Sequence, residues 1–279
     1  MDSIIFAGSG HGGIVALKSL QEQFSSIEVI SDDEVLLSLL RKQDRKIDSF
    51  MESPIALAVC AGYHAIVPKA ILNKKTIINT HPSLLPKYRG LHGLVWAMLN
   101  FEEKLGFSIH LMNEYIDDGE ILEQFSVDYT HQTSHEIMQL FDNYIRDNLG
   151  RVVKEFLEGK ITPIKQDRAE ATWVARRGIE DCIINFHEEN RYIETLFKAL
   201  VRPYPLPMIR DKNHTLYEVD GYRLLSKEYR ANIGQVVNSE EKSVYIKVKE
   251  GILIVENLID FETKEFCFAN DIFKIGQKL

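Results

Sequence analysis

The chain has 279 residues, of which 45% are hydrophobic and 27% charged, with 16 glycines and 8 prolines. This composition is typical of a globular protein with one large and one smaller domain, or with two of middling size, and it excludes disordered and collagen-like classes. The formal net charge of −8 has the wrong sign for a protein that binds a nucleic acid backbone over a broad surface, although it allows a local basic pocket.

The first eighty residues alternate short apolar runs with helix-length segments. Apolar positions at helical spacing predict a first helix around 15–24 and a second around 35–40. This alternation predicts a parallel, doubly wound sheet, in which ligands bind outside the carboxyl ends of the strands. The residues directly after Ile78 are therefore the first candidates for a site. Four of the apolar runs are expected to be buried strands: 3–7, 27–30, 55–60 and 76–79.

The next elements complete a first domain. A strand is expected over 106–112, and a second β-rich stretch follows it as far as Tyr129. Thr-Ser-His-Glu at 133–136 is a capping box, which predicts the start of a long amphipathic helix. Gly159 stops this helix, so the first domain is expected to cover residues 1–160.

The rest of the chain is expected to have two parts. Residues 161–209 contain a linker and a short helix, which ends before Pro203. Residues 210–279 form a small β-rich region, so the predicted fold class is α/β with a smaller β-rich C-terminal domain. The apolar runs of this region lie at 236–237, 244–248 and 252–255, with turn-prone residues at 238–240 and 250–251.

A glycine-rich turn follows the first strand. Residues 8–13 match the pattern GxGxxG, and Asp32 stands at the distance of an acid that binds a ribose. The pattern indicates either a dinucleotide site or a tight strand-to-helix crossover, where glycines accept positive φ and allow close packing. Taken alone, it favours neither interpretation.

A second candidate site is the sequence Asn-Thr-His-Pro-Ser-Leu-Leu-Pro-Lys-Tyr-Arg-Gly at 79–90. Residues two apart in an extended segment point to the same side, so Asn79 and His81 can meet one ligand atom. As an isolated pair, they would more often be a turn cap and a packed imidazole.

A third candidate is the segment 108–119, where a strand runs into a loop that carries Glu114, Asp117 and Asp118. A charged turn would account for these residues without any function. A carboxylate near an imidazole can also orient or polarise a general base.

Together, these motifs resemble the folate-dependent formyltransferase family, which includes glycinamide ribonucleotide, methionyl-tRNA and nucleotide-sugar formyltransferases. The resemblance covers a catalytic domain of roughly residues 1–160 and implies a Rossmann-like, mainly parallel sheet that does not bind NAD at its first glycine turn. The glycine pattern is then architecture, and Asp32 is a helix-start acid. The residues that carry the resemblance are Asn79-x-His81-Pro82-Ser83-Leu84-Leu85-Pro86, Arg89-Gly90, His110 and Asp117-x-Gly119.

The resemblance implies three catalytic residues. Formyl transfer brings an amine nitrogen to the formyl carbon of 10-formyltetrahydrofolate, and negative charge develops on the formyl oxygen. Asn79 is expected to donate a hydrogen bond to that oxyanion. His81 is expected to accept the amine proton as general base, or to share the oxyanion. Asp117 is expected to orient His81 or to receive the proton through water.

The resemblance also implies two sets of binding residues. The formyl donor, 10-formyltetrahydrofolate, is expected at Gly62, Tyr63, Ser83, Leu84, Leu85, Glu114 and Ile116. The acceptor is expected at Tyr88, Arg89, Gly90, His110, Arg177, Lys198 and Tyr204.

The second half of the chain bears on the acceptor. The segments 176–186 and 203–205 resemble a part that methionyl-tRNA and sugar formyltransferases share and that glycinamide ribonucleotide enzymes lack. The sequence departs from the usual pattern at Asn185, Lys198 and 206–207.

The acidic charge and the small β-rich tail favour the nucleotide-sugar enzymes, which formylate dTDP- or UDP-linked amino sugars for surface polysaccharide such as the O-antigen of lipopolysaccharide. Arg177 and Lys198 are then candidate cations for the pyrophosphate. A methionyl-tRNA formyltransferase, a formyltetrahydrofolate deformylase and a non-catalytic sensor remain alternatives.

No metal, nucleic acid or membrane partner is expected. His131 and His135 are four apart, but the helix begins between them, so they would not share a face as ligands do. The three cysteines show no CxxC spacing, and no apolar stretch reaches the roughly 18 residues of a membrane span, so a cytoplasmic location is expected. The hairpin predicted within 244–255 is marginal unless covered, and a two-fold homodimer through 210–279 is expected.

Overall fold

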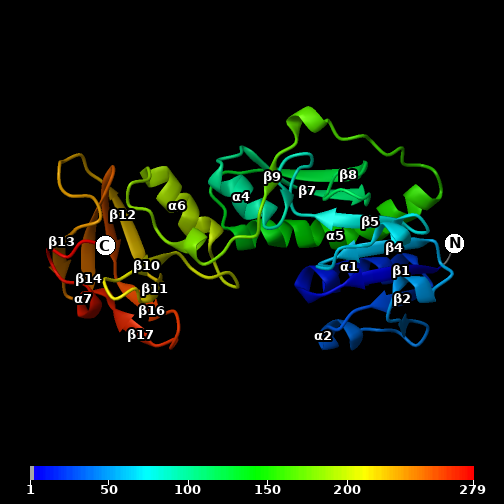
Figure 1. The fold of residues 1–279 in the computed structure, drawn as a ribbon, viewed down its shortest axis with the longest axis horizontal. Coiled ribbons are helices and arrows are strands. Elements are labelled where there is room, and N and C mark those ends of the chain that lie inside the picture. The colour runs from blue at the N-terminus through cyan, green and yellow to red at the C-terminus, as the bar shows by residue number, and fades with distance from the viewer. Residues whose placement is uncertain (1–2) are drawn as a thin grey trace. The chain divides into compact units, whose positions relative to one another are not determined.

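The computed structural model describes residues 3–279, which form two compact units (Figure 1). The division into functional parts at residues 160 and 209 stays a prediction. The first unit contains the chain up to Ala97, Glu102–Thr130 and Glu136–Arg176, and the second contains Met98–Phe101, His131–His135 and Arg177–Leu279.

The first unit is built on a seven-stranded sheet in the order β3-β2-β1-β4-β5-β7-β8. The pairs from β3 to β5 are parallel, whereas β5 with β7 and β7 with β8 are antiparallel. The mainly parallel, doubly wound sheet is thereby confirmed, and the colours of Figure 1 follow its strands from blue to green. The strands are β1 (Ser3–Gly8), β2 (Ser26–Ile30), β3 (Arg45–Lys46), β4 (Leu57–Ala61), β5 (Thr76–His81), β7 (Lys104–Leu111) and β8 (Ile121–Asp128).

Helices α1 and α5 supply much of the apolar core beside this sheet. Leu17 of α1 and Phe141 of α5 are fully buried, and the amide of Gly150 in α5 donates to the hydroxyl of Ser19 in α1. Helix α5 begins at Ser134, within the predicted capping box at 133–136, and Gly159 follows its end with a φ of +70°. The helices that lie wholly or mainly in this unit are α1 (Gly10–Gln23), α2 (Glu34–Leu37), α3 (Lys69–Leu72), α4 (Gly93–Leu99) and α5 (Ser134–Leu157), with short 3₁₀ turns η1 (Phe50–Glu52) and η2 (Arg168–Glu170).

The second predicted helix, over 35–40, is wrong in length, because α2 is a single turn. Leu36 is its only buried residue, and Val35 is exposed. The chain leaves the helix toward Arg41, whose guanidinium donates to the carbonyls of Gln21 and Phe24 at the end of α1. These long-range bonds outweigh the small gain of a second helical turn.

The first unit also contains a short two-stranded sheet, which includes residues of the 79–90 motif. Strand β6 (Arg89–Gly90) pairs in parallel with β9 (Trp173–Val174). This pairing fixes the chain after α5 beside the motif at 79–90.

The second unit contains two four-stranded antiparallel sheets within the described residues, which confirms the smaller β-rich region. One has the order β10-β11-β16-β17 and the other β12-β15-β14-β13. The elements are η3 (Glu180–Cys182), α6 (Asn190–Ala199), β10 (Met208–Arg210), β11 (Leu216–Val219), β12 (Tyr222–Ser226), β13 (Val236–Glu240), β14 (Ser243–Val248), β15 (Gly251–Val255), β16 (Asn257–Asp260), β17 (Phe266–Phe268) and α7 (Ala269–Ile272).

The predicted hairpin forms between β14 and β15, where Val248 pairs with Gly251. The turn expected at 238–240 is wrong, because these residues belong to β13 and Glu240 pairs with Ser243. The chain reverses at Glu241, whose φ is +39°, so the strand extends through polar residues that sequence patterns assign to turns. No helix among the described residues has the length and apolar character that a membrane span requires.

Candidate active site

Sheet register brings two polar side chains together at the end of β5. Asn79 of β5 pairs with His110 of β7, and the Nδ2 atom of Asn79 lies 3.3 Å from Nε2 of His110. The Nδ1 atom of His110 donates to the carbonyl of Leu111 at 2.8 Å, so in the neutral ring Nε2 is the acceptor. His110 therefore holds one amide hydrogen of Asn79 and leaves the second available to a ligand.

His81, two residues after Asn79, is enclosed by the loop that follows it. Its Nε2 atom lies 2.9 Å from the carbonyl oxygen of Tyr88, and its Nδ1 atom lies 3.4 Å from Oδ2 of Asp117. Burial lowers the pKa of His81 below its ordinary value, and His110 adds to this effect, although the Asp117 carboxylate and the Tyr88 carbonyl raise the pKa. The ring is therefore neutral near pH 7.

Asp117 completes the cluster from the loop after β7. Its Oδ1 atom lies 3.5 Å from Nε2 of His110, and its Oδ2 atom accepts a hydrogen bond of 2.9 Å from the amide of Gly90. Burial raises the pKa of Asp117, but the contacts with His110, His81 and Gly90 outweigh burial and lower the pKa to about 2. The carboxylate is therefore ionised at any physiological pH.

These contacts unite Asn79, His81, His110 and Asp117 in one polar cluster. The cluster combines an amide donor, a neutral imidazole and a carboxylate. This set can stabilise an oxyanion and accept a proton from a nucleophile.

The residues expected to bind folate fall into two groups. Gly62 and Tyr63 follow β4, while Glu114 and Ile116 follow β7, and an ion pair between Glu114 and Lys69 of α3 links the two loops. Ile116 is exposed, as are Ile66 and Tyr115 of the same loops, which no sequence motif singles out. The sequence signal for such residues is an apolar side chain in a loop that directly follows a strand, at the sheet edge where ligands are expected.

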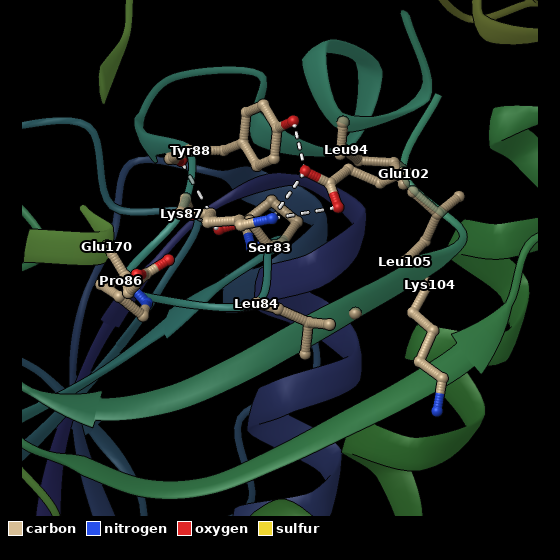
Figure 2. Close-up of a pocket in the computed structure, with 13 residues that line it drawn as sticks. Ser83, Leu84, Pro86, Lys87, Tyr88, Leu94, Glu102, Lys104, Leu105 and Glu170 are labelled. Atoms are coloured by element: carbon tan, nitrogen blue, oxygen red, sulfur yellow. Dashed lines mark hydrogen bonds and ion pairs between the residues drawn. The ribbon is translucent and has the colours of Figure 1, made fainter. Parts of the chain in front are cut away.

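The second group belongs to the 79–90 motif and follows His81. Ser83 and Leu84 line a cavity of about 310 Å³, whereas Leu85 is buried and its amide donates to the hydroxyl of Ser108. Figure 2 shows the carboxylate of Glu102 between the ammonium of Lys87 and the hydroxyl of Tyr88 in this cavity.

The residues expected to bind the acceptor are divided between the two units. Tyr88, Arg89, Gly90 and His110 belong to the first unit, where Arg89 is only 3% and His110 only 1% exposed. The guanidinium of Arg89 stacks over the ring of Trp173, with 5.8 Å from Cζ to the ring centroid, and Trp173 is 66% exposed.

The other three expected acceptor residues belong to the second unit. Arg177 lies over the ring of Tyr204 at 5.7 Å, and the Nζ atom of Lys198 lies 3.2 Å from Nδ1 of His131. Arg177 is buried, so it contributes to the packing of this unit.

The carboxylate of Asp33 accepts a hydrogen bond from the glycine turn after β1. One carboxylate oxygen of Asp33 accepts from the amide of Gly10 at 2.7 Å, and the other accepts from the amide of Leu36 and caps α2. The expectation that Asp32 starts the helix is therefore wrong by one residue, because Asp32 is exposed and Asp33 has the capping geometry. A carboxylate thus occupies the amide at which a pyrophosphate would bind in a dinucleotide site.

No group of three or more His, Cys, Asp or Glu side chains within residues 3–279 is arranged to hold a metal ion.

Comparisons with known proteins identify the family. A model described as formyl transferase matches residues 13–144, and a model described as formyl transferase, C-terminal domain, matches residues 179–276. The methionyl-tRNA formyltransferase of Clostridium novyi is 30% identical over 224 residues, which cover 78% of this chain and 71% of that protein.

Two solved structures share the fold. HypX from Aquifex aeolicus in complex with tetrahydrofolic acid has a TM-score of 0.69 and 13% identity, over 98% of this chain and 46% of HypX, so the chain spans less than half of that protein. The N-formyltransferase from Helicobacter canadensis in complex with folinic acid and dTDP-3-aminofucose has a TM-score of 0.65 and 18% identity, over 92% of this chain and 99% of that one. The matched models and the likeness to the Clostridium novyi enzyme place the chain in the folate-dependent formyltransferase family.

Proposed function

We propose that this chain transfers the formyl group of 10-formyltetrahydrofolate to the amine of a nucleotide-linked amino sugar, in the synthesis of a surface polysaccharide such as O-antigen. The observation that carries the reaction is the polar cluster at the end of β5, in which Asn79 contacts His110 and both His110 and His81 contact Asp117. The tetrahydrofolic acid bound to HypX and the folinic acid bound to the Helicobacter canadensis enzyme support a reduced folate as the donor.

In the proposed reaction, the acceptor amine attacks the formyl carbon. A carbon–nitrogen bond forms to the acceptor, the bond to N10 of the folate breaks, and N10 takes up the proton that the amine loses, so tetrahydrofolate leaves. Asn79 has one amide hydrogen engaged by His110 and one available, which we assign to the formyl oxygen as its negative charge develops.

His81 is the proposed general base. Its Nε2–H donates to the Tyr88 carbonyl, so the lone pair of the neutral ring is on Nδ1, which faces Asp117. Protonation at Nδ1 creates an ion pair between the ring and the carboxylate, so Asp117 favours proton transfer from the amine. The proposed chemistry relies on these side chains and uses no metal ion.

We assign the donor to the loops after β4 and β7. The exposed apolar side chains of Ile66, Tyr115 and Ile116 provide a surface for the flat rings of a folate. Gly62, Tyr63 and Glu114 belong to the same loops, while Ser83, Leu84 and Leu85 would support the donor through the stiff loop after His81.

We assign the acceptor to the face that carries Trp173. Arg89 holds one face of its ring, and the ring's high exposure leaves surface for a sugar or a nucleotide base. Arg177, Lys198 and Tyr204 belong to the second unit, so their role toward the acceptor stays an expectation from the sequence motif. The net charge of −8 supports a small anionic acceptor over an RNA.

Methionyl-tRNA is the second candidate acceptor, because the Clostridium novyi relative is a methionyl-tRNA formyltransferase. The two acceptors are separated by incubating the protein with 10-formyltetrahydrofolate and either a panel of dTDP- and UDP-amino sugars or methionyl-tRNA. Mass spectrometry should detect a formyl group on one nucleotide sugar. Formylation of the tRNA alone would replace the proposed acceptor, and release of formate without an acceptor would indicate a deformylase.

A further inference from the structure

A second set of contacts runs beside the hydrogen bond between Gly90 and Asp117. The residue before Gly90 is Arg89 and the residue after Asp117 is Asp118, and these two form an ion pair of 2.7 Å between Nη1 and Oδ1. The side chain of Arg89 is 3% exposed and that of Asp118 is 6% exposed. The two loops are therefore joined twice, once by backbone amide to carboxylate and once by a buried ion pair.

Gln166 connects the two sides of this junction. Its Oε1 atom accepts from Nε and Nη2 of Arg89 at 3.2 and 2.7 Å, and its Nε2 atom donates to the carbonyls of Asp117 and Gly119 at 2.8 and 2.7 Å. Arg89, Asp118 and Gln166, here called the Arg89 cluster, therefore surround the backbone of Asp117.

The backbone of Asp117 needs such support. Its φ is +48°, in the left-handed region that residues other than glycine rarely adopt. A residue persists in this region only where its surroundings over-determine it. The Arg89 cluster fixes the carbonyl of Asp117 and the side chain of the next residue, and thereby fixes the direction in which the Asp117 carboxylate points toward His81.

We propose that Arg89 and Asp118 are positioning residues that hold the Asp117 carboxylate against His81, and that they do not contact the acceptor. This proposal rests on the catalytic role of Asp117 proposed above. It replaces the acceptor-binding role that the sequence motif implies for Arg89, since its guanidinium is buried and engaged by Asp118, Gln166 and Trp173. It also gives a role to Asp118, which the motif leaves unspecified.

The test uses the double variant Arg89→Met/Asp118→Leu in the full chain, with the acceptor that the wild type formylates. Replacing both charges avoids leaving one buried ion without its partner, so most of the melting temperature should be retained. We expect kcat to fall roughly 10- to 100-fold, since a small misplacement of a catalytic group has an effect of this order. The KM values for donor and acceptor should stay within about threefold.

The pH profile provides a readout that a purely structural role would not change. The charged and titratable groups that influence the pKa of His81 are Asp117, which raises it, and His110, which lowers it. If the Asp117 carboxylate moves away, the pKa of His81 falls further, so the acidic limb of kcat/KM should shift to lower pH in the double variant.

Two further variants keep the proposal testable if the double variant does not fold. Arg89→Lys keeps the charge but cannot hold Asp118 and Gln166 together in the planar geometry of a guanidinium, so it should also lower kcat. Arg168→Ala is the matched control. Arg168 contacts the same Asp118 carboxylate at 2.7 Å but is 71% exposed, so its removal should leave kcat and the pH profile unchanged.

Asp117→Asn separates the failure of this proposal from the failure of the proposed site. If Asp117→Asn is inactive but the Arg89 and Asp118 variants keep the wild-type kcat and pH profile, the positioning role is wrong. If these variants raise the acceptor KM more than tenfold at unchanged kcat, Arg89 binds the acceptor and the proposal is also wrong. If Asp117→Asn keeps normal turnover, the catalytic role of Asp117 fails, and the positioning proposal fails with it.

Discussion

The carbonyl oxygen of Tyr88 lies 2.9 Å from Nε2 of His81 and determines which nitrogen of the ring carries the proton. A carbonyl only accepts hydrogen bonds, so Nε2 is protonated and Nδ1 carries the lone pair of the neutral ring. The loop after β5 thus turns the basic nitrogen toward Asp117. Tyr88 acts here through its backbone, so its side chain is free to bond Glu102.

The first prediction is a pH dependence governed by His81. Because burial lowers its pKa from the ordinary value of 6.5, the base form is present above that lowered pKa and is lost as the pH falls through it. We expect kcat/KM to be level near pH 7 and to decline on an acidic limb below 6.5. His81→Ala should lose roughly 10²- to 10⁴-fold in kcat and also lose this limb. A limb that persists in the variant would assign the titration to another group.

The second prediction concerns the amide of Asn79. Asn79→Ala should lower turnover roughly 10²- to 10³-fold while acceptor binding stays nearly intact, because the amide acts on charge that develops in the transition state. The His81→Ala/Asn79→Ala double variant should lose far less than the product of the two single losses, since the residues act as a unit. Single-turnover rates and acceptor binding measure both effects. Fully multiplicative losses would contradict a shared step.

The placement of Asn79 and His81 on one side of a strand was predictable from the sequence, because both lie in β5 and residues two apart in a strand share a side. The parallel sheet was predictable as well, from apolar runs of strand length. The environment of Arg89 was not, because its burial depends on Asp118 and Gln166, which are distant in the sequence. The helix-start acid was assigned to Asp32 instead of Asp33, since a one-residue difference, which local patterns do not resolve, decides which carboxylate reaches the amides of Gly10 and Leu36.

The third prediction follows from the contact between Asp33 and Gly10. Because the Asp33 carboxylate already accepts from the Gly10 amide, a pyrophosphate at this turn would meet a like charge. Neither NAD nor NADP should shift the melting temperature, whereas a reduced folate should raise it, since only a ligand that prefers the folded state stabilises it. Differential scanning fluorimetry with each ligand tests this. A clear shift with NAD would restore the dinucleotide interpretation.

The fourth prediction concerns Trp173. If its exposed ring supports the acceptor, Trp173→Ala should raise the acceptor KM about tenfold with little change in kcat, an effect expected for the loss of about 1.4 kcal/mol of uniform binding. Trp173→Phe should recover part of the affinity, because it retains an aromatic face. An unchanged KM in Trp173→Ala would remove this residue from the acceptor site without affecting the catalytic cluster.

The last prediction is the homodimer. The β14–β15 hairpin gives no reason for a partner, because β12 and β13 flank it and most of its apolar residues are buried within the described chain. Strand β17 gives a better reason to expect a partner. Among residues 3–279 it is an edge strand, Phe266 is 55% exposed, and its ring contacts that of Phe268 two residues on, so this edge carries an exposed aromatic side chain.

We therefore expect a two-fold homodimer in which β17 contributes to the contact. Phe266→Lys should convert it to a monomer, while Ile275→Lys, a change at a comparably exposed apolar residue that precedes the pairing of Gly276 with Val236 of β13, should leave it dimeric. Light scattering at micromolar concentration measures the mass of each. A monomeric wild type would contradict the dimer itself, and a Phe266→Lys variant that stays dimeric would place the interface elsewhere on the chain.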